Sequence, residues 1–220
     1  MLTNPERPLV YAHRGARDVA PENTLAAFKA AVHAGADGIE CDVSRCKTGE
    51  IIIIHDDSTR RTTNRAVTIK GSTYATLRRL DAGAWFAPEF TGEKLPVLEE
   101  LLDMAGHSLL MNIEIKGHSM RDDGIEVEIA RQLAVRGQSA NTLISSFNPW
   151  ALKRMHQADP AIARALLYWA KSPAYLALKS VVKDLPIAAL HPEYTLVDRE
   201  YMNWAHGEGY LVNVWTVNKH

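Results

Sequence analysis

Strand-like and helix-like segments alternate along most of this chain, and that alternation constrains its fold more than any other feature. From residue 97 onward, amphipathic helical segments and short apolar strand segments follow one another with only short connections. This pattern predicts right-handed βαβ units and a parallel sheet. The strands are expected to begin at Leu9, Ile39, Leu109, Thr142, Ala163, Ile187 and Leu211. The helices are expected near residues 25–34, 97–105, 124–136, 149–158, 172–183 and 198–206.

Seven parallel strands in 220 residues predict an α/β fold of the TIM (β/α)8 barrel type that lacks its C-terminal β/α unit. A complete barrel has eight strands and typically about 250 residues. The alternative is an open, doubly wound sheet, but no Gly-x-Gly-x-x-Gly segment follows the first strand to support it. We therefore expect residues 1–220 to form a single barrel domain.

Residues 38 to 56 predict an antiparallel hairpin whose polar residues gather at one end. In its first half, Glu40 and Asp42 alternate with apolar residues, as in a strand with one polar face. The second half is an isoleucine run that ends at His55. The connection between the halves is too short for a parallel crossover. Counting back from the turn at Thr48 places position 42 opposite position 54 or 55, so two carboxylates and a histidine meet.

Residues 57–96 interrupt the alternation of strands and helices. This segment is rich in Thr, Arg, Gly and Asp, and it contains Trp85, Phe86 and Phe90. We expect an insertion with little regular structure inside the barrel domain. Long insertions of this kind are commonly functional, as lids or walls of a binding site.

Three acidic residues lie at the carboxyl ends of neighbouring predicted strands, where barrel enzymes carry their active sites. They are Glu40, Asp42 and Glu114. Carboxylates on adjacent strands, about 5 Å apart, repel one another strongly unless a cation lies between them. Carboxylate oxygens favour Mg²⁺ or Ca²⁺ over zinc, so we expect one divalent metal ion here. The alternative is a structural ion network in which Arg14 and Lys116 pair with these acids.

Two histidines are expected beside this acidic cluster. His13 ends the first strand and His55 ends the hairpin, which suggests a general acid and a general base. Arg14, next to His13, is suited to clamp a phosphate group. A single histidine at a strand end is more often a structural hydrogen-bonding residue, but two that converge on one acidic cluster favour catalysis. His191 is a further candidate for lining the pocket.

Eight segments of the chain, in order and spread over nearly its whole length, resemble the glycerophosphodiester phosphodiesterase family. The likeness is to its short bacterial cytoplasmic members. The segments are His13-Arg14-Gly15, Pro21-Glu22-Asn23-Thr24, Glu40-x-Asp42, His55-Asp56, Arg61-Thr62-Thr63-Asn64, Asn112-Ile113-Glu114-Ile115-Lys116, Ser145-Ser146-Phe147 and Val214-Trp215-Thr216-Val217-Asn218.

The resemblance implies a TIM barrel with an insertion after His55-Asp56 and a divalent metal held by the three carboxylates. It implies His13 and His55 as acid and base, and Arg14 and Lys116 as phosphate ligands. The substrates would be deacylated phospholipid head groups such as glycerophosphocholine or glycerophosphoethanolamine. The products would be glycerol 3-phosphate and an alcohol, with a cyclic phosphate as the expected intermediate and direct attack by water as the alternative.

Two aromatic residues near the strand ends, Phe147 and Trp215, are candidates for an apolar wall beside the glycerol carbons. The alternative for both is an ordinary place in the core. Family members normally continue with a further helix, strand and helix where this sequence ends at His220. We therefore expect the sheet to stay open between its seventh and first strands, with lower stability and activity than in a closed barrel.

Two other functions remain open from the sequence. One is a barrel that binds glycerophosphodiesters without turnover, and the other is a phosphodiesterase resembling phospholipases C or D. The formal net charge of −1 gives no support for bulk binding of nucleic acid. No apolar run approaches the ~20 residues of a membrane-spanning helix, so we expect no membrane insertion and a cytoplasmic location. The expected partner is a small-molecule substrate, and the oligomeric state is left open.

Overall fold

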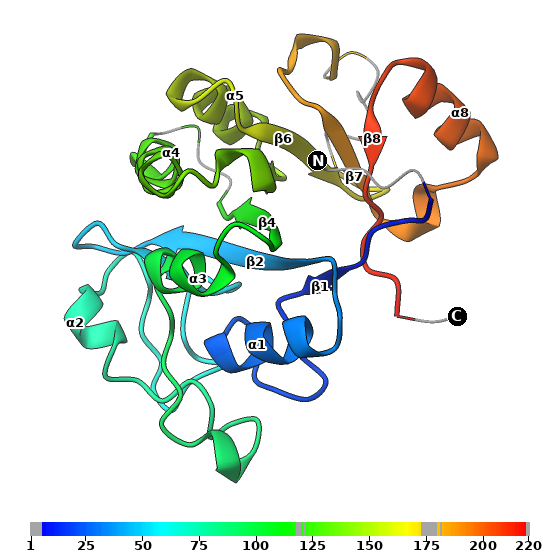
Figure 1. Ribbon diagram of the computed structural model, residues 1–220. Coiled ribbons are helices and arrows are strands. Elements are labelled where there is room, and N and C mark those ends of the chain that lie inside the picture. Colours follow the sequence, from blue (N-terminus) through cyan, green and yellow to red (C-terminus); the bar gives the residue numbers. More distant parts are fainter. Residues whose placement is uncertain (1–5, 118–119, 121, 173–179, 181, 219–220) are drawn as a thin grey trace.

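The computed structural model describes residues 6–117, 120, 122–172, 180 and 182–218. Its parallel strands follow one another in the order β1-β2-β4-β5-β6-β7-β8 and curve into part of a barrel (Figure 1). Their bounds are β1 (Tyr11–His13), β2 (Gly38–Arg45), β4 (Leu110–Ile115), β5 (Thr142–Ser146), β6 (Ala163–Tyr168), β7 (Ala189–Pro192) and β8 (Leu211–Val212). All neighbours on this path pair in parallel, which confirms the sheet predicted from the alternation.

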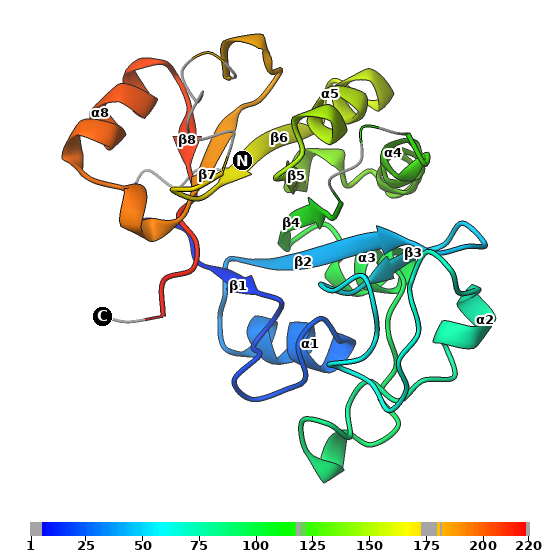
Figure 2. The same ribbon diagram turned by 180° about the vertical axis from the view of Figure 1, so that it is seen from behind.

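The helices lie along the outer side of this sheet (Figures 1 and 2). The longer ones are α1 (Leu25–His33), α3 (Leu98–Ala105), α4 (Ile125–Arg136), α5 (Pro149–Ala158) and α8 (Arg199–Gly207). Short 3-10 turns are η1 (Pro88–Phe90), η2 (Ser139–Asn141), η3 (Val182–Asp184) and η4 (Tyr194–Leu196). The helix expected at 172–183 lies mostly outside the described residues.

Local capping chemistry explains where several helices begin. The side chain of Thr24 accepts a hydrogen bond from the backbone N–H of Ala27 and caps α1. Asn148 accepts from the N–H of Trp150, and Pro149 follows it at the first helical position of α5. Each cap satisfies a backbone donor that the first turn of a helix leaves free. The sequence signal for α5 is thereby confirmed.

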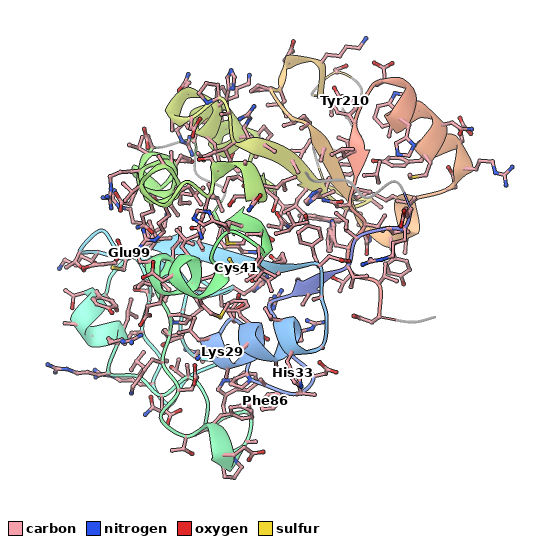
Figure 3. The ribbon with its side chains drawn as sticks, viewed as in Figure 1. Lys29, His33, Cys41, Phe86, Glu99 and Tyr210 are labelled. Atoms are coloured by element: carbon pink, nitrogen blue, oxygen red, sulfur yellow. The ribbon has the colours of Figure 1, made fainter. Side chains whose placement is uncertain are left out.

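The hairpin is formed by β2 and β3 (Ile51–Ile53), which pair antiparallel with Val43 opposite Ile53. The N–H of Ile54 then donates to the carbonyl of Asp42 over 2.9 Å, which confirms the expected register. The apolar residues of β2 face the helices. Cys41, for example, is buried in the core shared with α3 (Figure 3). The opposite face carries Glu40 and Asp42 into the barrel interior.

The insertion at 57–96 has its own small core. Ile69, Leu77, Leu80 and Leu95 pack with two isoleucines of the hairpin arm, Ile52 and Ile54. Its regular elements are α2 (Tyr74–Leu77) and η1, so the expectation of little regular structure is confirmed. Figures 1 and 2 show the insertion extending away from the hairpin on the side where α1 lies. Burial of these apolar side chains against the hairpin therefore anchors a segment that contains little regular secondary structure of its own.

The two ends of the strand order are β1 and β8, so the described sheet is an open barrel-type sheet, as expected. The apolar pattern from Leu211 predicts a last strand that continues to Val217, but β8 is shorter, because regular pairing with β7 ends at Val212. Beyond it, Trp215 forms one isolated bridge with Glu193. Within the described part of the chain, no helix combines the length and the apolarity needed to cross a membrane.

Candidate active site

Sheet register brings the predicted acidic residues together. Asp42 on β2 is the direct partner of Glu114 on β4, and Glu40 lies two residues before Asp42 on the same face. One oxygen from each carboxylate lies within 4.8 Å of the others. Asp42 is completely buried, and the other two are each 7% exposed. The predicted acidic cluster therefore exists as a compact group on one face of two neighbouring strands, although in β2 it lies within the strand and not at its carboxyl end.

The cluster is electrostatically strained. Burial, followed by repulsion from Asp42 and Glu114, raises the pKa of Glu40 well above its usual range. Burial and Asp42 also raise the pKa of Glu114, to about 7, although Lys116 opposes the shift. Buried carboxylates with raised pKa values favour a cationic partner among them.

Two basic residues lie against the cluster. The ammonium group of Lys116 donates to Glu114 Oε1 over 2.7 Å and lies 3.4 Å from Asp42 Oδ1. The backbone N–H of Arg14 donates to Glu40 Oε2 over 2.9 Å, and its Nε lies 3.3 Å from Asp42 Oδ2. Burial lowers the pKa of Lys116, but Glu114 and Asp42 outweigh it, so the net shift is upward. The structure therefore contains the ion pairs of the alternative interpretation, in which Arg14 and Lys116 pair with these acids.

The ion pairs do not fully satisfy the acidic cluster. Arg14 also donates to Glu22 over 3.0 Å, so its charge is shared with a fourth carboxylate. Oδ1 of Asp42 is buried, and beyond its 3.4 Å ion pair with Lys116 it accepts no hydrogen bond from the described residues. A buried carboxylate oxygen with so long a contact is one of the groups that coordination can satisfy. Three converging carboxylates are also the hard oxygen donors that Mg²⁺ and Ca²⁺ prefer, so the residues fit such an ion.

Asn23, which is not among the predicted site residues, supports the cluster. Its Nδ2 donates to Asp42 Oδ2 over 2.8 Å, and its Oδ1 accepts from the N–H of Asp42 over 3.3 Å. Asn23 has a φ of 56°, a left-handed conformation that asparagine tolerates better than most residues. The sequence feature that could have identified Asn23 is its position directly before the helix cap Thr24, in one of the segments that carry the family resemblance.

His13 lies beside the cluster. It is the strand partner of Glu40, and its Nε2 is 3.9 Å from Glu40 Oε2. Burial, followed by the charge of Arg14, lowers the pKa of His13 to about 4, so the imidazole is neutral at pH 7. Its Nδ1 is buried and has no hydrogen-bond partner among the described residues.

His55 follows β3 and has a carboxylate partner. Its Nδ1 lies 2.7 Å from Oδ1 of the adjacent Asp56, and about a third of its side chain is exposed, 33%. It is near enough to His13 to contribute to the lowered pKa of that residue. The structure therefore brings both predicted histidines to the same end of the sheet as the carboxylates.

An aromatic group borders the cluster on its β4 side. The Phe147 ring lies edge-to-face against Trp169 and Trp215, with ring centroids 5.1 and 5.6 Å apart. A cleft of about 170 Å³ lies next to it. The residues that line this cleft are Glu114, Ile115, Lys116, Gly117, Phe147 and Trp169. Phe147 and Trp169 thus supply apolar surface directly beside two polar members of the site.

Trp169 is not among the predicted site residues, because the apolar pattern from Ala163 indicates only that it ends a strand. Its position just past β6 was the available signal, since barrel sites form at the carboxyl ends of strands. Trp215 packs against Phe147, and its indole N–H donates to the carbonyl of His191 over 2.8 Å. His191 is buried on β7, and its Nε2 lies 2.9 Å from Nδ2 of Asn213. It lies among the strands and is not among the cleft-lining residues.

Comparison with known proteins identifies close relatives of the chain. A model of the glycerophosphoryl diester phosphodiesterase family matches residues 13–220. A glycerophosphodiester phosphodiesterase of Caldanaerobacter subterraneus subsp. tengcongensis is 36% identical over 216 residues, which cover 97% of this chain and 87% of that protein. A glycerophosphodiester phosphodiesterase of Bacillus subtilis is 32% identical, covering 99% of this chain and 79% of its own length.

Solved structures agree with these matches. An Oleispira antarctica phosphodiesterase in complex with the product sn-glycerol-3-phosphate is 32% identical, with a TM-score of 0.83 over 96% of this chain and 85% of that one. A glycerophosphodiester phosphodiesterase of Agrobacterium tumefaciens is 25% identical, with a TM-score of 0.81 over 97% and 88% of the two chains. These similarities confirm the barrel-type fold.

Proposed function

Because the chain belongs to the glycerophosphoryl diester phosphodiesterase family, we propose that it hydrolyses glycerophosphodiesters to glycerol 3-phosphate and an alcohol. The observation that carries this proposal is the arrangement of Glu40, Asp42 and Glu114 within 4.8 Å of one another, with His13 and His55 at the same end of the sheet. The named relatives and the product complex of the Oleispira protein support the same substrate class.

The three carboxylates would hold one divalent cation, Mg²⁺ or Ca²⁺. Such an ion supplies positive charge that stabilises the negative phosphate oxygens as the diester reacts. Support comes from the raised pKa values of Glu40 and Glu114, and from the buried Oδ1 of Asp42, whose contact with Lys116 is a long ion pair and which accepts no hydrogen bond from the described residues.

Arg14 and Lys116 would bind the non-bridging oxygens of the phosphate. The guanidinium has five N–H donors and the ammonium has three, so each can contact phosphate while keeping a carboxylate partner. Phe147 and Trp169, with Trp215 packed behind Phe147, would contact the glycerol carbons.

The two histidines would carry the protons. His13 is neutral at pH 7 because burial and Arg14 lower its pKa to about 4, and it would take the proton of the glycerol 2-hydroxyl as that oxygen attacks phosphorus. His55 would donate a proton from Nε2 to the departing alcohol oxygen as the phosphorus–oxygen bond breaks. A cyclic phosphate forms, and water opens it with the two histidines in exchanged roles.

A coupled assay for glycerol 3-phosphate released from glycerophosphocholine tests this function. We expect release that EDTA abolishes and that added Mg²⁺ or Ca²⁺ restores. Release that survives complete chelation would contradict the metal assignment. No release from folded, metal-supplied protein would favour a barrel that binds glycerophosphodiesters without turnover.

A further inference from the structure

A continuous chain of charged side chains connects His55 to Arg14. Asp56 contacts His55 through Oδ1, and Arg61 donates from Nε to Asp56 Oδ2 over 2.9 Å and from Nη2 to Oδ1 over 3.2 Å. The same guanidinium donates from Nη1 and Nη2 to the two carboxylate oxygens of Glu22, both over 2.8 Å. Glu22 in turn accepts from Nη1 of Arg14 over 3.0 Å.

Arg61 is the centre of this chain, and it belongs to the insertion. Glu22 lies in the loop before α1, 39 residues from Arg61 in the sequence, and Asp56 directly follows the hairpin, so one side chain joins the insertion to the loop before α1 and to the end of the hairpin. The guanidinium makes two-point contacts with both carboxylates, which a rigid planar fork can do and a lysine ammonium cannot. Arg61 is itself partly exposed, whereas the side chain of Glu22 is 11% exposed.

These contacts determine how the two carboxylates are oriented. The shortest contact of Arg61 with Asp56 uses Oδ2, which leaves Oδ1 directed at Nδ1 of His55. A carboxylate that accepts the Nδ1 proton sets the tautomer of an imidazole and stabilises its protonated form. The other imidazole nitrogen, Nε2, is then the one that can exchange a proton with a substrate. Glu22 similarly contacts Nη1 of the Arg14 guanidinium, whose Nε lies beside Asp42 of the acidic cluster.

We infer that Arg61 and Asp56 are positioning residues of this site: through them the insertion fixes the imidazole of His55, and through Glu22 it fixes Arg14. This inference rests on the proposed function, in which His55 protonates the departing alcohol. Among the described residues, the titratable groups near His55 are Asp56, which Arg61 contacts on its other side, and the neutral imidazole of His13 on β1.

Two substrates with different leaving groups separate positioning of an acid from a general structural effect. Choline leaves glycerophosphocholine as an alkoxide and needs a proton, whereas nitrophenolate leaves a glycerophospho-p-nitrophenyl ester without one. In the metal-supplied protein, we expect Asp56→Asn and Arg61→Met to lower the first-turnover rate of choline release from glycerophosphocholine by about 10²-fold, within the usual range for acid catalysis. With the nitrophenyl ester, nitrophenolate release in the first turnover precedes the step in which His55 activates water, so its loss in both variants is expected to be within about threefold.

Arg60→Met is the matched control, because Arg60 is an exposed arginine next to Arg61 in the same loop. We expect it to leave both rates unchanged. Arg61→Lys keeps the charge without the planar fork, and its first-turnover rate with glycerophosphocholine is expected to lie between those of Arg61→Met and the unchanged protein. Thermal melts verify folding, and Asp56→Asn with Arg61→Lys suffice for the test if Arg61→Met does not fold.

One result would overturn the positioning role of Asp56 and Arg61, and a different result would overturn the acid role of His55. Equal losses with both substrates in Asp56→Asn and Arg61→Met, while His55→Ala still discriminates between the substrates, would show that these two residues do not act through His55. Equal losses of the first-turnover release rate with both substrates in His55→Ala itself would instead refute the acid role of His55 in the proposed function.

Discussion

His13 and Glu40 are direct partners across β1 and β2, with His13 Nε2 3.9 Å from Glu40 Oε2. The pairing places an imidazole that is neutral at pH 7 beside the carboxylates proposed to hold the metal. Strand register alone creates this proximity, because the parallel pairing of β1 and β2 sets His13, the last residue of β1, opposite Glu40. The chemistry proposed for the site depends on it.

Removing the imidazole of His13 should remove the proposed base. We expect His13→Asn to lower kcat with glycerophosphocholine by about 10²–10⁴-fold, the usual contribution of general acid–base catalysis, with little change in the melting temperature. His33→Asn, at the exposed end of α1, is the control and should keep full activity. A rate near that of the unchanged protein in His13→Asn would exclude His13 from the mechanism.

Glu40→Gln should separate stability from metal binding. Glutamine still offers an oxygen to the N–H of Arg14 but removes one charge from a buried cluster whose members repel one another. We therefore expect metal-free Glu40→Gln to melt about 2–4 °C higher, as about 1 kcal/mol would produce in a chain of this size.

Metal titrations followed by thermal melting complete the test of Glu40→Gln. The added Mg²⁺ or Ca²⁺ should raise the melting temperature of the unchanged protein more than that of the variant, because the variant has lost a ligand. Glu128→Gln on α4 changes a charge outside the site and should show no gain in the metal-free state. A lower metal-free melting temperature for Glu40→Gln would contradict a destabilising repulsion among these buried carboxylates.

Trp169→Ala should weaken substrate use without affecting proton transfer. Trp169 lines the cleft beside Lys116 and packs edge-to-face on Phe147, so its removal opens the apolar wall. The loss of one such aromatic contact predicts a fall in kcat/KM of about tenfold, mostly through KM. Trp150→Ala, on the outer side of α5, is the matched control, since Trp150 is half-exposed. Equal kinetic effects of the two substitutions would exclude this role of Trp169.

His191 should make the protein sensitive to mild acid. Burial lowers the pKa of His191 to about 3, whereas a histidine in the unfolded chain titrates near 6.5. The unfolded state therefore binds the proton first, and the free energy of unfolding falls as the pH drops from about 6.5 towards about 3. Between pH 7 and pH 5 the contribution of His191 to this loss is about 2 kcal/mol.

Urea unfolding of His191→Gln at pH 7 and pH 5 measures this contribution. Glutamine retains an acceptor for the side chain of Asn213 but does not titrate. The loss of stability between the two pH values should be smaller in the variant by about that amount, and His13 accounts for part of what remains. An unchanged loss would show that His191 is not the titrating group.

Much of the fold could be predicted because its signals are local. The alternation of Glu40 and Asp42 with apolar residues has the period of a strand, and the short turn before Ile51 permits only an antiparallel return. The helix start at Asn148-Pro149 is equally local. The shortened last strand was not predictable, because residues after Val212 extend the strand only if β7 has backbone groups opposite them with which they can pair.

The sequence by itself determined the parallel sheet, the hairpin and the grouping of Glu40, Asp42 and Glu114, since periodicity and chain order encode these features. Only the tertiary structure decided the roles of Asn23, Arg61 and Trp169. Each meets its partner across loops that are far apart in the chain, and loop geometry has no periodic signal. The pKa shifts of His13 and Glu114 likewise arise from burial and from charges that folding brings together.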